Sequence, residues 1–496
     1  MSTNSLSFEF DNSYARLPEN FFCRLRPTPV HFPKLIRINK NLAMELKIDP
    51  DLLSSEEGVK ILAGNKIPTG ADPLAMAYAG HQFGNWVPQL GDGRAILLGE
   101  LIDINGIRRD LQLKGCGITP FSRMGDGRAA VGPIIREFMV SEAMNALNID
   151  STRSLAAIST GNFVVRENIH PGAILTRVAK SHVRVGTFQF FASRGDIPAL
   201  QSLADYVISR LYPIAKKSEN PYLSLLNLVI EKQARLIAKW QLIGFIHGVM
   251  NTDNMSISGE TIDFGPCAFM DFFHPDTVYS SIDELGRYAY KNQPYIAQWN
   301  LACFAETLLP LISSNEEKAT KLAQESVNSF TDLFDAEYLA HFRKKLGLFE
   351  EDKDDLNLGT ALLECMQQNK TDFTLTFRYL SCLKRKRTEY DTVLHQLFEN
   401  KSSLDVWLAR WRKRLDLEQV SDSRRIKAMQ SVNPAFIPRN HMIETIIESA
   451  IDNGDFTLFN NFLCIMETPY NDQLAHDRFF QPPRPDEIIK ATFCGT

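Results

Sequence analysis

The sequence predicts an α+β fold in which a β-sheet with one helix precedes a largely helical body. Between about residues 90 and 190, short apolar runs alternate with polar residues and end at turn residues, which is the pattern of β-strands. Beyond residue 197 the apolar residues recur with helical spacing, and this spacing dominates from about residue 300 onward. A sheet followed by helices favours an α+β architecture.

The strand-like region contains a hairpin and one helix. Residues 95–101 and 109–114 flank Asn105-Gly106, a dipeptide that is typical of hairpin turns. A helix is expected over residues 134–147, because its apolar residues fall on one stripe. Further strands are expected over residues 163–167 and 172–179.

The rest of the chain is predicted to be mainly helical. Amphipathic helices are expected over residues 205–211 and 227–245, and the second leads directly into His247. We expect four segments: an N-terminal extension wrapped on a larger body (1–74), a sheet-bearing lobe (75–193), a helical lobe with catalytic and metal loops (194–390) and a C-terminal helical extension (391–496).

Composition and charge narrow the class of protein. At 496 residues, with 44% hydrophobic and 23% charged residues, the chain reads as globular and is long enough for roughly three domains. A net charge of −5 argues against a nucleic-acid partner, because binding to phosphates needs a basic surface. The eight cysteines form no CxxC pair, which argues against a structural zinc site. No signal peptide and no long apolar run is present, so we expect a cytoplasmic protein without a membrane segment, and a monomer.

The stretch HGVMNTDNMSISGETIDFGP, residues 247–266, has the order of the catalytic and metal-binding loops of protein kinases. Asn254 follows His247 by seven residues, and Asp263 opens an Asp-Phe-Gly sequence. A small hairpin with Gly259 at its turn is expected between Asn254 and Asp263. Amide and carboxylate oxygens suit Mg²⁺, which takes one or two protein ligands and completes its shell with phosphates and water. We therefore predict a two-lobed, protein-kinase-like fold with a metal site; alternatively, Asn254 caps a turn and Asp263 ends a strand.

A lysine and a glutamate have the order of the kinase nucleotide clamp. Lys114 ends a strand that reads LQLK, and the corresponding kinase lysine holds nucleotide phosphates. Glu137, in the helix that follows, is the expected ion-pair partner of Lys114. The alternative is an edge-strand lysine and a surface glutamate.

The sequence GDGR occurs twice, at residues 91–94 and 125–128, on either side of the Lys114 strand. Glycine lets backbone N–H groups approach a phosphate, and arginine adds a bidentate donor. One such loop is most simply a tight turn, but the repetition favours contact with a nucleotide. Arg177 and Arg184 are either further phosphate clamps or ordinary strand arginines.

The catalytic aspartate of kinases is replaced by Val249, which can neither accept a proton nor bind a metal. Asp253 lies four residues later, next to Asn254, and is the expected general base. A well-placed base contributes about 10²- to 10⁴-fold to a rate. A base in a new place suggests that the site acts on a differently placed phosphorus atom.

Together these blocks resemble the selenoprotein O family of kinase-like proteins. The matching blocks are LGDGRA, LQLKGCGITPFSRMGDGRAAVG, IREFMVSEAMNAL, HGVMNTDNMSI and TIDFGP. The resemblance implies that ATP binds inverted relative to kinases and that AMP is transferred to Ser, Thr or Tyr hydroxyls of proteins, with release of pyrophosphate. It implies Asp253 as the base, Asn254 and Asp263 as ligands of Mg²⁺ or Mn²⁺, and Glu137 as the residue that orients Lys114. The nucleotide contacts that it implies are Gly91, Gly93, Arg94, Lys114, Asp126, Gly127, Arg177, Arg184 and Asp263.

The cysteines leave one question of regulation open. Some members of the family pair a cysteine near the carboxyl end with one in the loop after Asp-Phe-Gly. Here that loop lacks a cysteine, and Cys267 is the nearest to it. Pairing of Cys494 with Cys267 is therefore an open alternative.

Three other functions fit the same motifs. A conventional kinase would transfer the γ-phosphoryl group, although Val249 argues against it. A non-catalytic pseudokinase would bind the nucleotide without transferring any part of it. The same site would also serve transfer of UMP from UTP.

Overall fold

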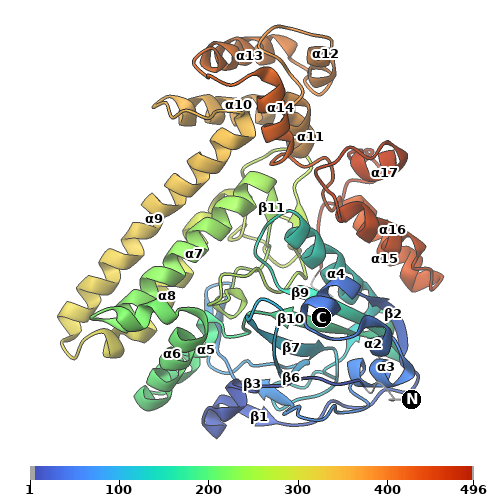
Figure 1. The fold of residues 1–496 in the computed structure, drawn as a ribbon, viewed down its shortest axis with the longest axis vertical. Coiled ribbons are helices and arrows are strands. Elements are labelled where there is room, and N and C mark those ends of the chain that lie inside the picture. Colours follow the sequence, from blue (N-terminus) through green and yellow to red (C-terminus); the bar gives the residue numbers. More distant parts are fainter. Residues whose placement is uncertain (1–5, 494–496) are drawn as a thin grey trace.

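An antiparallel sheet forms the amino-terminal part of the protein in the computed structural model, which describes residues 6–493 (Figure 1). Its strands run in the order β1-β3-β6-β7-β10-β9-β2, and the short β8 pairs with β10. The bounds are β1 Phe22–Arg24, β2 Lys34–Ile38, β3 Leu74–Met76, β6 Ala95–Ile102, β7 Arg108–Lys114, β8 Ala129–Ala130, β9 Arg153–Val165 and β10 Ile169–Ala179.

The hairpin of β6 and β7 confirms the sequence prediction. The two strands pair from Ala95 opposite Lys114 to Ile102 opposite Arg108. The turn is stabilised by Asp103, whose carboxylate accepts hydrogen bonds from the backbone N–H groups of Asn105 and Ile107. This register places Lys114 at the end of its strand, beside the loop that leads into β6. The predicted strand over 163–167 overlaps the end of β9, which stops at Val165, and the one over 172–179 lies within β10.

Helix α4 (Val131–Ala146) lies across the sheet and confirms the predicted helix. It contacts β9 and β10 on one side and the carboxyl-terminal helices α15 and α16 on the other. The rings of Phe138 and Phe459 meet edge to face with their centroids 5.5 Å apart. Arg136 of α4 forms an ion pair with Glu444 of α15. The helix that carries Glu137 is therefore enclosed on both sides.

The first 74 residues are more than an extension wrapped on a larger body, because they supply strands to the sheet. β1 pairs with β3, and β2 pairs with the long strand β9. Helices α1 (Lys40–Glu45), α2 (Pro50–Leu53) and α3 (Glu56–Leu62) follow and contribute to a hydrophobic core that also contains residues of β6, β7, β9 and β10. The strands are short and partly polar, which hid them in the sequence.

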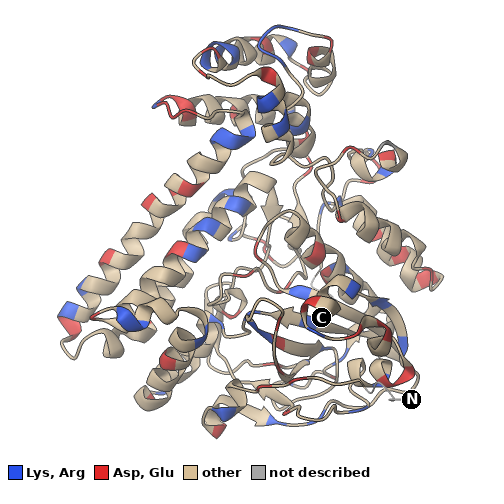
Figure 2. Ribbon diagram, in the orientation of Figure 1, with Lys and Arg blue, Asp and Glu red and all other residues tan. Residues whose placement is uncertain are grey.

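The helical region begins with α5, directly after β10 and twelve residues before the predicted start at residue 197. Its first helices are α5 Val185–Ala192, α6 Ile197–Leu211, α7 Pro221–Ile243, α8 Gln293–Ile312 and α9 Glu316–Leu346. Helix α7 begins six residues before the predicted start, because Asn220 caps it by accepting a hydrogen bond from Leu223 N–H, and it ends at Gly244 in the left-handed conformation. Figure 2 shows acidic and basic residues interspersed along α7 and α9, as expected for solvated helix faces.

The carboxyl-terminal residues form two groups of helices that pack in different places. Helices α10 (Asp355–Asn369), α11 (Phe373–Leu380), α12 (Tyr390–His395) and α13 (Lys401–Leu415) build a second core with the end of α9, and α14 (Asp422–Gln430) packs beside them (Figure 1). Helices α15 (Asn440–Asp452) and α16 (Thr457–Met466) instead join the core of α4, and the short α17 (Asp477–Phe480) follows. None of the helices within residues 6–493 combines the length and apolar character that crossing a bilayer requires.

Candidate functional site

His247 ties together the two ends of the kinase-like motif. Its side chain is fully buried, and Nε2 donates a hydrogen bond to the carbonyl oxygen of Ile262 at 2.9 Å. Nδ1 accepts a hydrogen bond from the backbone N–H of Val249 at 3.3 Å. The ring stacks on Trp240 of α7. The imidazole therefore holds the segment before Asp263 against the start of the loop.

The segment between Asn254 and Asp263 is the small hairpin that the sequence predicts. Met255 and Thr261 form an antiparallel bridge, and Gly259 occupies the turn with a positive φ of 75°. The hairpin returns the chain so that Asn254 and Asp263 line the same cavity, of about 610 Å³.

Most of the residues predicted from the sequence meet in this cavity. Those that line it are Gly91, Gly93, Arg94, Asp126, Gly127, Asp253, Asn254 and Asp263. Lys114, Glu137, Arg177 and Arg184 do not line it. They lie behind its wall and act on the lining residues through hydrogen bonds and ion pairs.

A buried charge cluster stands behind Asp263. Lys114 Nζ lies 2.6 Å from Glu137 Oε2 and 2.8 Å from Asp263 Oδ1. Arg177 approaches the same two acids, at 2.6 Å from Glu137 and 3.8 Å from Asp263. Burial opposes the charged form of Asp263, but Lys114, Arg177 and Arg94 outweigh burial and hold the pKa of this carboxyl well below its usual value. Asp263 is therefore a permanent anion at the cavity wall.

The backbone of Asp263 is in the left-handed region, with a φ of 69°. Aspartate tolerates this region better than most residues, although it is uncommon for any side chain other than glycine. Such backbone conformations cluster at functional sites, where the surrounding structure maintains them. Here the His247 contact and the Lys114 ion pair fix the chain on either side of Asp263.

Asp253 is the second acid of the cavity, and its environment is different. Its side chain is only 6% exposed, and Oδ2 accepts a hydrogen bond from Gln82 Nε2 at 3.1 Å. Arg184 donates to the backbone carbonyl of Asp253 at 2.8 Å and therefore does not neutralise the carboxylate directly. Burial raises the pKa of Asp253 to about 6, against the opposing effects of Gln82 and Arg184. A buried carboxylate of raised pKa beside a cavity is suited to accept a proton.

The glycines of the two GDGR loops are required by close packing. A Cβ on Gly91 would lie 2.4 Å from the Phe121 ring, and one on Gly93 would lie 2.7 Å from the Phe121 carbonyl oxygen. A Cβ on Gly127 would lie 2.0 Å from the carbonyl oxygen of Gly117. The first loop is therefore pressed against the segment that leads to the second, and the two line one cavity together.

The charged residues of these loops differ in their contacts. Asp126 forms an ion pair with Arg166 at 2.9 Å at the rim of the cavity. Arg94 makes no ion pair with any residue between 6 and 493, so its guanidinium remains available to an anion in the cavity that it lines. Asp92, between Gly91 and Gly93, is buried and accepts hydrogen bonds from Met76 N–H and Gln112 Nε2.

The donor set at Asn254 and Asp263 fits a hard divalent cation. Asn254 Nδ2 donates to the carbonyl oxygen of Val249 at 3.1 Å, which leaves the amide oxygen as its ligating atom. Across the described residues, no three His, Cys, Asp or Glu side chains converge on a point. One amide oxygen and one carboxylate match a cation that takes its remaining ligands from phosphates and water.

Gln82, which lines the cavity, and Asp92, which lies behind it, are polar residues that the sequence analysis did not single out. Gln82 contacts the carboxylate of Asp253, and Asp92 lies within hydrogen-bond reach of Gln112 behind the first loop. Asp92 is part of a GDGR motif, so the motif itself was a signal. No sequence signal marked Gln82, which lies 171 residues before Asp253.

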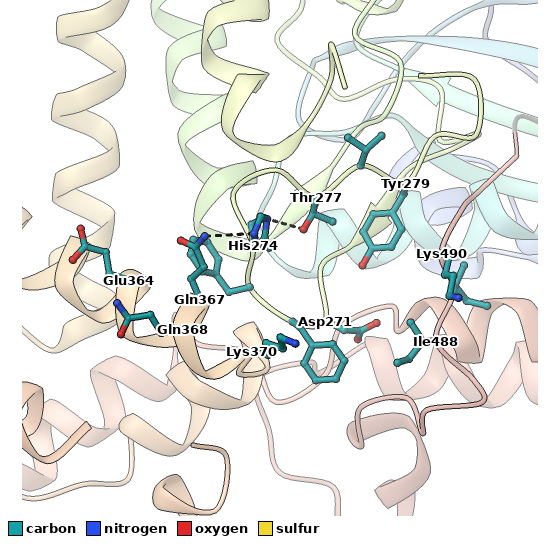
Figure 3. A pocket seen from close by; sticks show the side chains of 14 residues that line it. Asp271, His274, Thr277, Tyr279, Glu364, Gln367, Gln368, Lys370, Ile488 and Lys490 are labelled. Atoms are coloured by element: carbon teal, nitrogen blue, oxygen red, sulfur yellow. Dashed lines mark hydrogen bonds between the residues drawn. The ribbon is translucent and has the colours of Figure 1, made fainter. Parts of the chain in front are cut away.

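A second cavity, of about 770 Å³, lies elsewhere and is larger (Figure 3). It is lined by residues 271–279, by the end of α10 and by residues 488–490 of the carboxyl-terminal segment. His274 approaches Gln367 there at 3.4 Å. None of the predicted site residues lines this cavity, so its size does not make it the site. Cys494, whose pairing with Cys267 was an open alternative, lies outside the described residues.

Comparison with known proteins identifies the family of this chain. The sequence model of the family "Protein adenylyltransferase SelO" matches residues 4–467. A "Protein nucleotidyltransferase YdiU" of Rhodopseudomonas palustris (strain BisB5) is 57% identical over 492 residues, which cover 99% of this chain and 100% of the relative. Proteins of the same description from Rhizobium meliloti (strain 1021) and Bradyrhizobium sp. (strain BTAi1) are each 56% identical over 99% of this chain and 100% of their own length. The chain therefore belongs to the SelO family of protein adenylyltransferases and is a nucleotidyltransferase.

Proposed function

We propose that this chain transfers AMP from ATP to Ser, Thr or Tyr hydroxyls of proteins in the cavity between the GDGR loops and the 247–266 loop. The observation that carries the proposal is the convergence of Asp253, Asn254 and Asp263 on one cavity with both glycine-rich loops. The family supplies the reaction class, with ATP as substrate and a protein as acceptor.

In the proposed reaction Asp253 accepts the proton of the acceptor hydroxyl. The hydroxyl oxygen then forms a bond to the α-phosphorus of ATP, and the bond to the β-phosphate oxygen breaks, so that pyrophosphate leaves. Val249 lies at the position of the kinase base and lines the same cavity, but its side chain cannot accept a proton. Asp253 is thus the nearest candidate for this role within the loop.

Asn254 and Asp263 would hold a Mg²⁺ or Mn²⁺ ion. Such an ion, when bound, neutralises phosphate charge and helps the leaving group depart. Asp263 is prepared for this role by Lys114 and Arg177, which keep it ionised.

The remaining predicted residues bind and orient the nucleotide. Arg94, Asp126 and the glycines Gly91, Gly93 and Gly127 line the cavity and are proposed to contact the nucleotide directly. Lys114 is oriented by Glu137, and it reaches the cavity through Asp263. Arg177 and Arg184, proposed as phosphate clamps, contact Glu137 and the backbone of Asp253 in this structure. A contact with phosphates would require them to rearrange.

We extend the proposal to the architecture. The sheet with α4 and α5 corresponds to the first lobe of a kinase-like fold and the helices from α6 onward to the second, with the site between them. The segments proposed from the sequence keep their bounds at 75–193 and 194–390, with strands of the first 74 residues added to the sheet.

Two alternatives share the site. UMP transfer from UTP would use the same loops, and a non-catalytic nucleotide binder would need no base. Burial of the Asp253 carboxylate favours the catalytic function over the non-catalytic one. Removing a carboxylate from water costs free energy, and a role as base gives a reason for its burial.

Isotopic labelling separates these functions. The protein is incubated with Mg²⁺ or Mn²⁺, casein as a hydroxyl-bearing acceptor, and ATP labelled in either the α- or the γ-phosphate. Adenylyl transfer places only the α-label on protein. Transfer of the γ-label alone would overturn the proposal in favour of a kinase, and ATP binding without transfer of either label would support a non-catalytic role. Competition with UTP distinguishes AMP from UMP transfer.

A further inference from the structure

A small hairpin outside the main sheet lies against the loop that carries Asp253. Its strands are β4 (Gly80–Gln82) and β5 (Asn85–Val87), which pair with each other alone. Neither the kinase-like motif nor the family resemblance pointed to this element. We infer that the hairpin positions the catalytic base: Gln82 holds the carboxylate of Asp253 in one orientation, and Gly80 provides the space that this orientation needs. The inference rests on the proposed role of Asp253.

Three consecutive residues of the hairpin bind three consecutive residues of the loop. The backbone N–H of His81 donates to Thr252 Oγ1 at 2.7 Å, and the N–H of Phe83 donates to Asn251 Oδ1 at 3.0 Å. Between them, Gln82 Nε2 donates to Asp253 Oδ2 at 3.1 Å. The hairpin therefore fixes the side chains of the loop as a set.

A residue with a side chain does not fit at position 80, because Asp253 occupies the space beside Gly80. Its φ is not in the left-handed region, so another residue would suffer no backbone strain there. A Cβ at this position, however, would lie 2.6 Å from Asp253 Oδ1 and 3.0 Å from its Cβ. The carboxylate thus rests against the backbone of residue 80.

The carboxylate of Asp253 has one side-chain donor among the described residues. Within residues 6–493, Gln82 is the one side chain that donates to it, and Oδ1 is buried without a hydrogen-bond partner. Buried acceptors normally have a partner, and an unsatisfied one calls for an explanation. Here the explanation is packing: Oδ1 rests against Gly80, and Gln82 orients the carboxylate through Oδ2.

The hairpin is itself anchored, as a positioning element must be. The N–H of Ala79 donates to the carbonyl oxygen of Gly186 in α5 at 2.9 Å. Gln189 of α5 lies 3.0 Å from the ring nitrogen Nδ1 of His81, and the His81 ring lies between Trp86 and Trp299. These contacts tie the hairpin to α5 and α8, so the position of Gln82 does not depend on a flexible loop.

The test is a set of variants assayed with α-labelled ATP and casein. Gln82→Met keeps the size of the side chain and removes the donor, so kcat should fall by roughly 10- to 100-fold while ATP affinity and melting temperature stay unchanged. Gly80→Ala should lower kcat similarly, because the added methyl group displaces the carboxylate. Asn85→Ala, an exposed position on the same hairpin, is the matched control and should leave kcat unchanged.

A double variant separates positioning from a merely structural role. If Gln82 acts through Asp253, Gln82→Met should have no further effect in an Asp253→Ala background. A further loss in that background would overturn the inference, as would a kcat of Gln82→Met within twofold of wild type while Asp253→Ala is inactive. Full transfer by Asp253→Ala would instead overturn the proposed base, so the two failures are distinguishable.

Discussion

Two of the three acids that line the cavity, Asp263 and Asp253, define what we call its first and second sides, and their surroundings differ. On the first side Asp263 lies beside Lys114 and Arg177, which lower its pKa. On the second side Asp253 is buried next to an uncharged amide, Gln82, and its pKa is raised. The same residue type is thus prepared in one place to stay negative and in the other to accept a proton. The difference teaches that the role of each acid follows from its neighbours rather than from its place in the motif.

The largest effect is expected from Asp263→Asn. The substitution keeps the shape of the side chain but removes the charge that a divalent cation needs, so transfer should fall by roughly 10³-fold or more. Transfer of α-label is measured over a titration of Mg²⁺ and of Mn²⁺, with a chelator as the metal-free reference. If transfer by Asp263→Asn depended on the metal concentration as it does in the wild type, Asp263 would not be a metal ligand.

Asp253→Ala should have the next largest effect, and it should change the rate of transfer without changing ATP binding. Loss of the base should lower kcat by about 10²- to 10⁴-fold, and ATP binding should be retained because Asp263 and its cluster remain. Equilibrium binding of a fluorescent ATP analogue is compared with the rate of label transfer. If Asp253→Ala weakened binding as much as Asp263→Asn does, the two sides would not be functionally distinct.

Glu137→Gln tests the charge cluster behind Asp263, in which Glu137 pairs with Lys114 and Arg177. Lys114 and Arg177 would then share a single acid, so the free energy of unfolding should fall by on the order of 3 kcal/mol and transfer by roughly tenfold. Urea unfolding and the transfer assay measure the two effects. Glu142→Gln, on the same helix but paired with the half-buried Arg153, is the control and should cost less in both. Equal losses would show that Glu137 has no special role.

Gly91→Ala should give the smallest effect on transfer, and its main effect should be on the stability of the fold. Overpacking against Phe121 should lower the free energy of unfolding by about 1–3 kcal/mol. Gly106→Ala is the reference: both glycines have a positive φ, but a Cβ on Gly106 would meet open space, so only the backbone conformation opposes it, at about 1–2 kcal/mol. Thermal unfolding of both variants is compared. A smaller shift for Gly91 than for Gly106 would contradict the close packing of the first GDGR loop.

The loop at 247–266 could be predicted from the sequence because its parts are close along the chain. Asn254, Gly259 and Asp263 lie within ten residues, so a single short hairpin determines how they meet, and the bridge between Met255 and Thr261 confirms that hairpin. The β6–β7 hairpin and α4 were predicted for the same reason, since their signals are local.

Residues whose place depends on long-range pairing could not be predicted. Arg177 lies opposite Gln112 in the β10–β7 pairing, and this register turns it toward Glu137 rather than into the cavity. Gln82 reaches Asp253 only because a separate hairpin docks on the loop. Strands β1 and β2 are short, and only pairing with β3 and β9 reveals them.

The enclosure of α4 has a consequence for how the enzyme matures. The outer surface of this helix is covered by α15 and α16, about three hundred residues later in the chain, through Phe459 and Glu444. While the protein is being synthesised, the sheet and the loops of the cavity all leave the ribosome before this cover exists. The face of α4 that α15 and α16 cover therefore stays exposed until translation is almost complete, so the helix that carries Glu137 reaches its final packing only after the rest of the site has been synthesised.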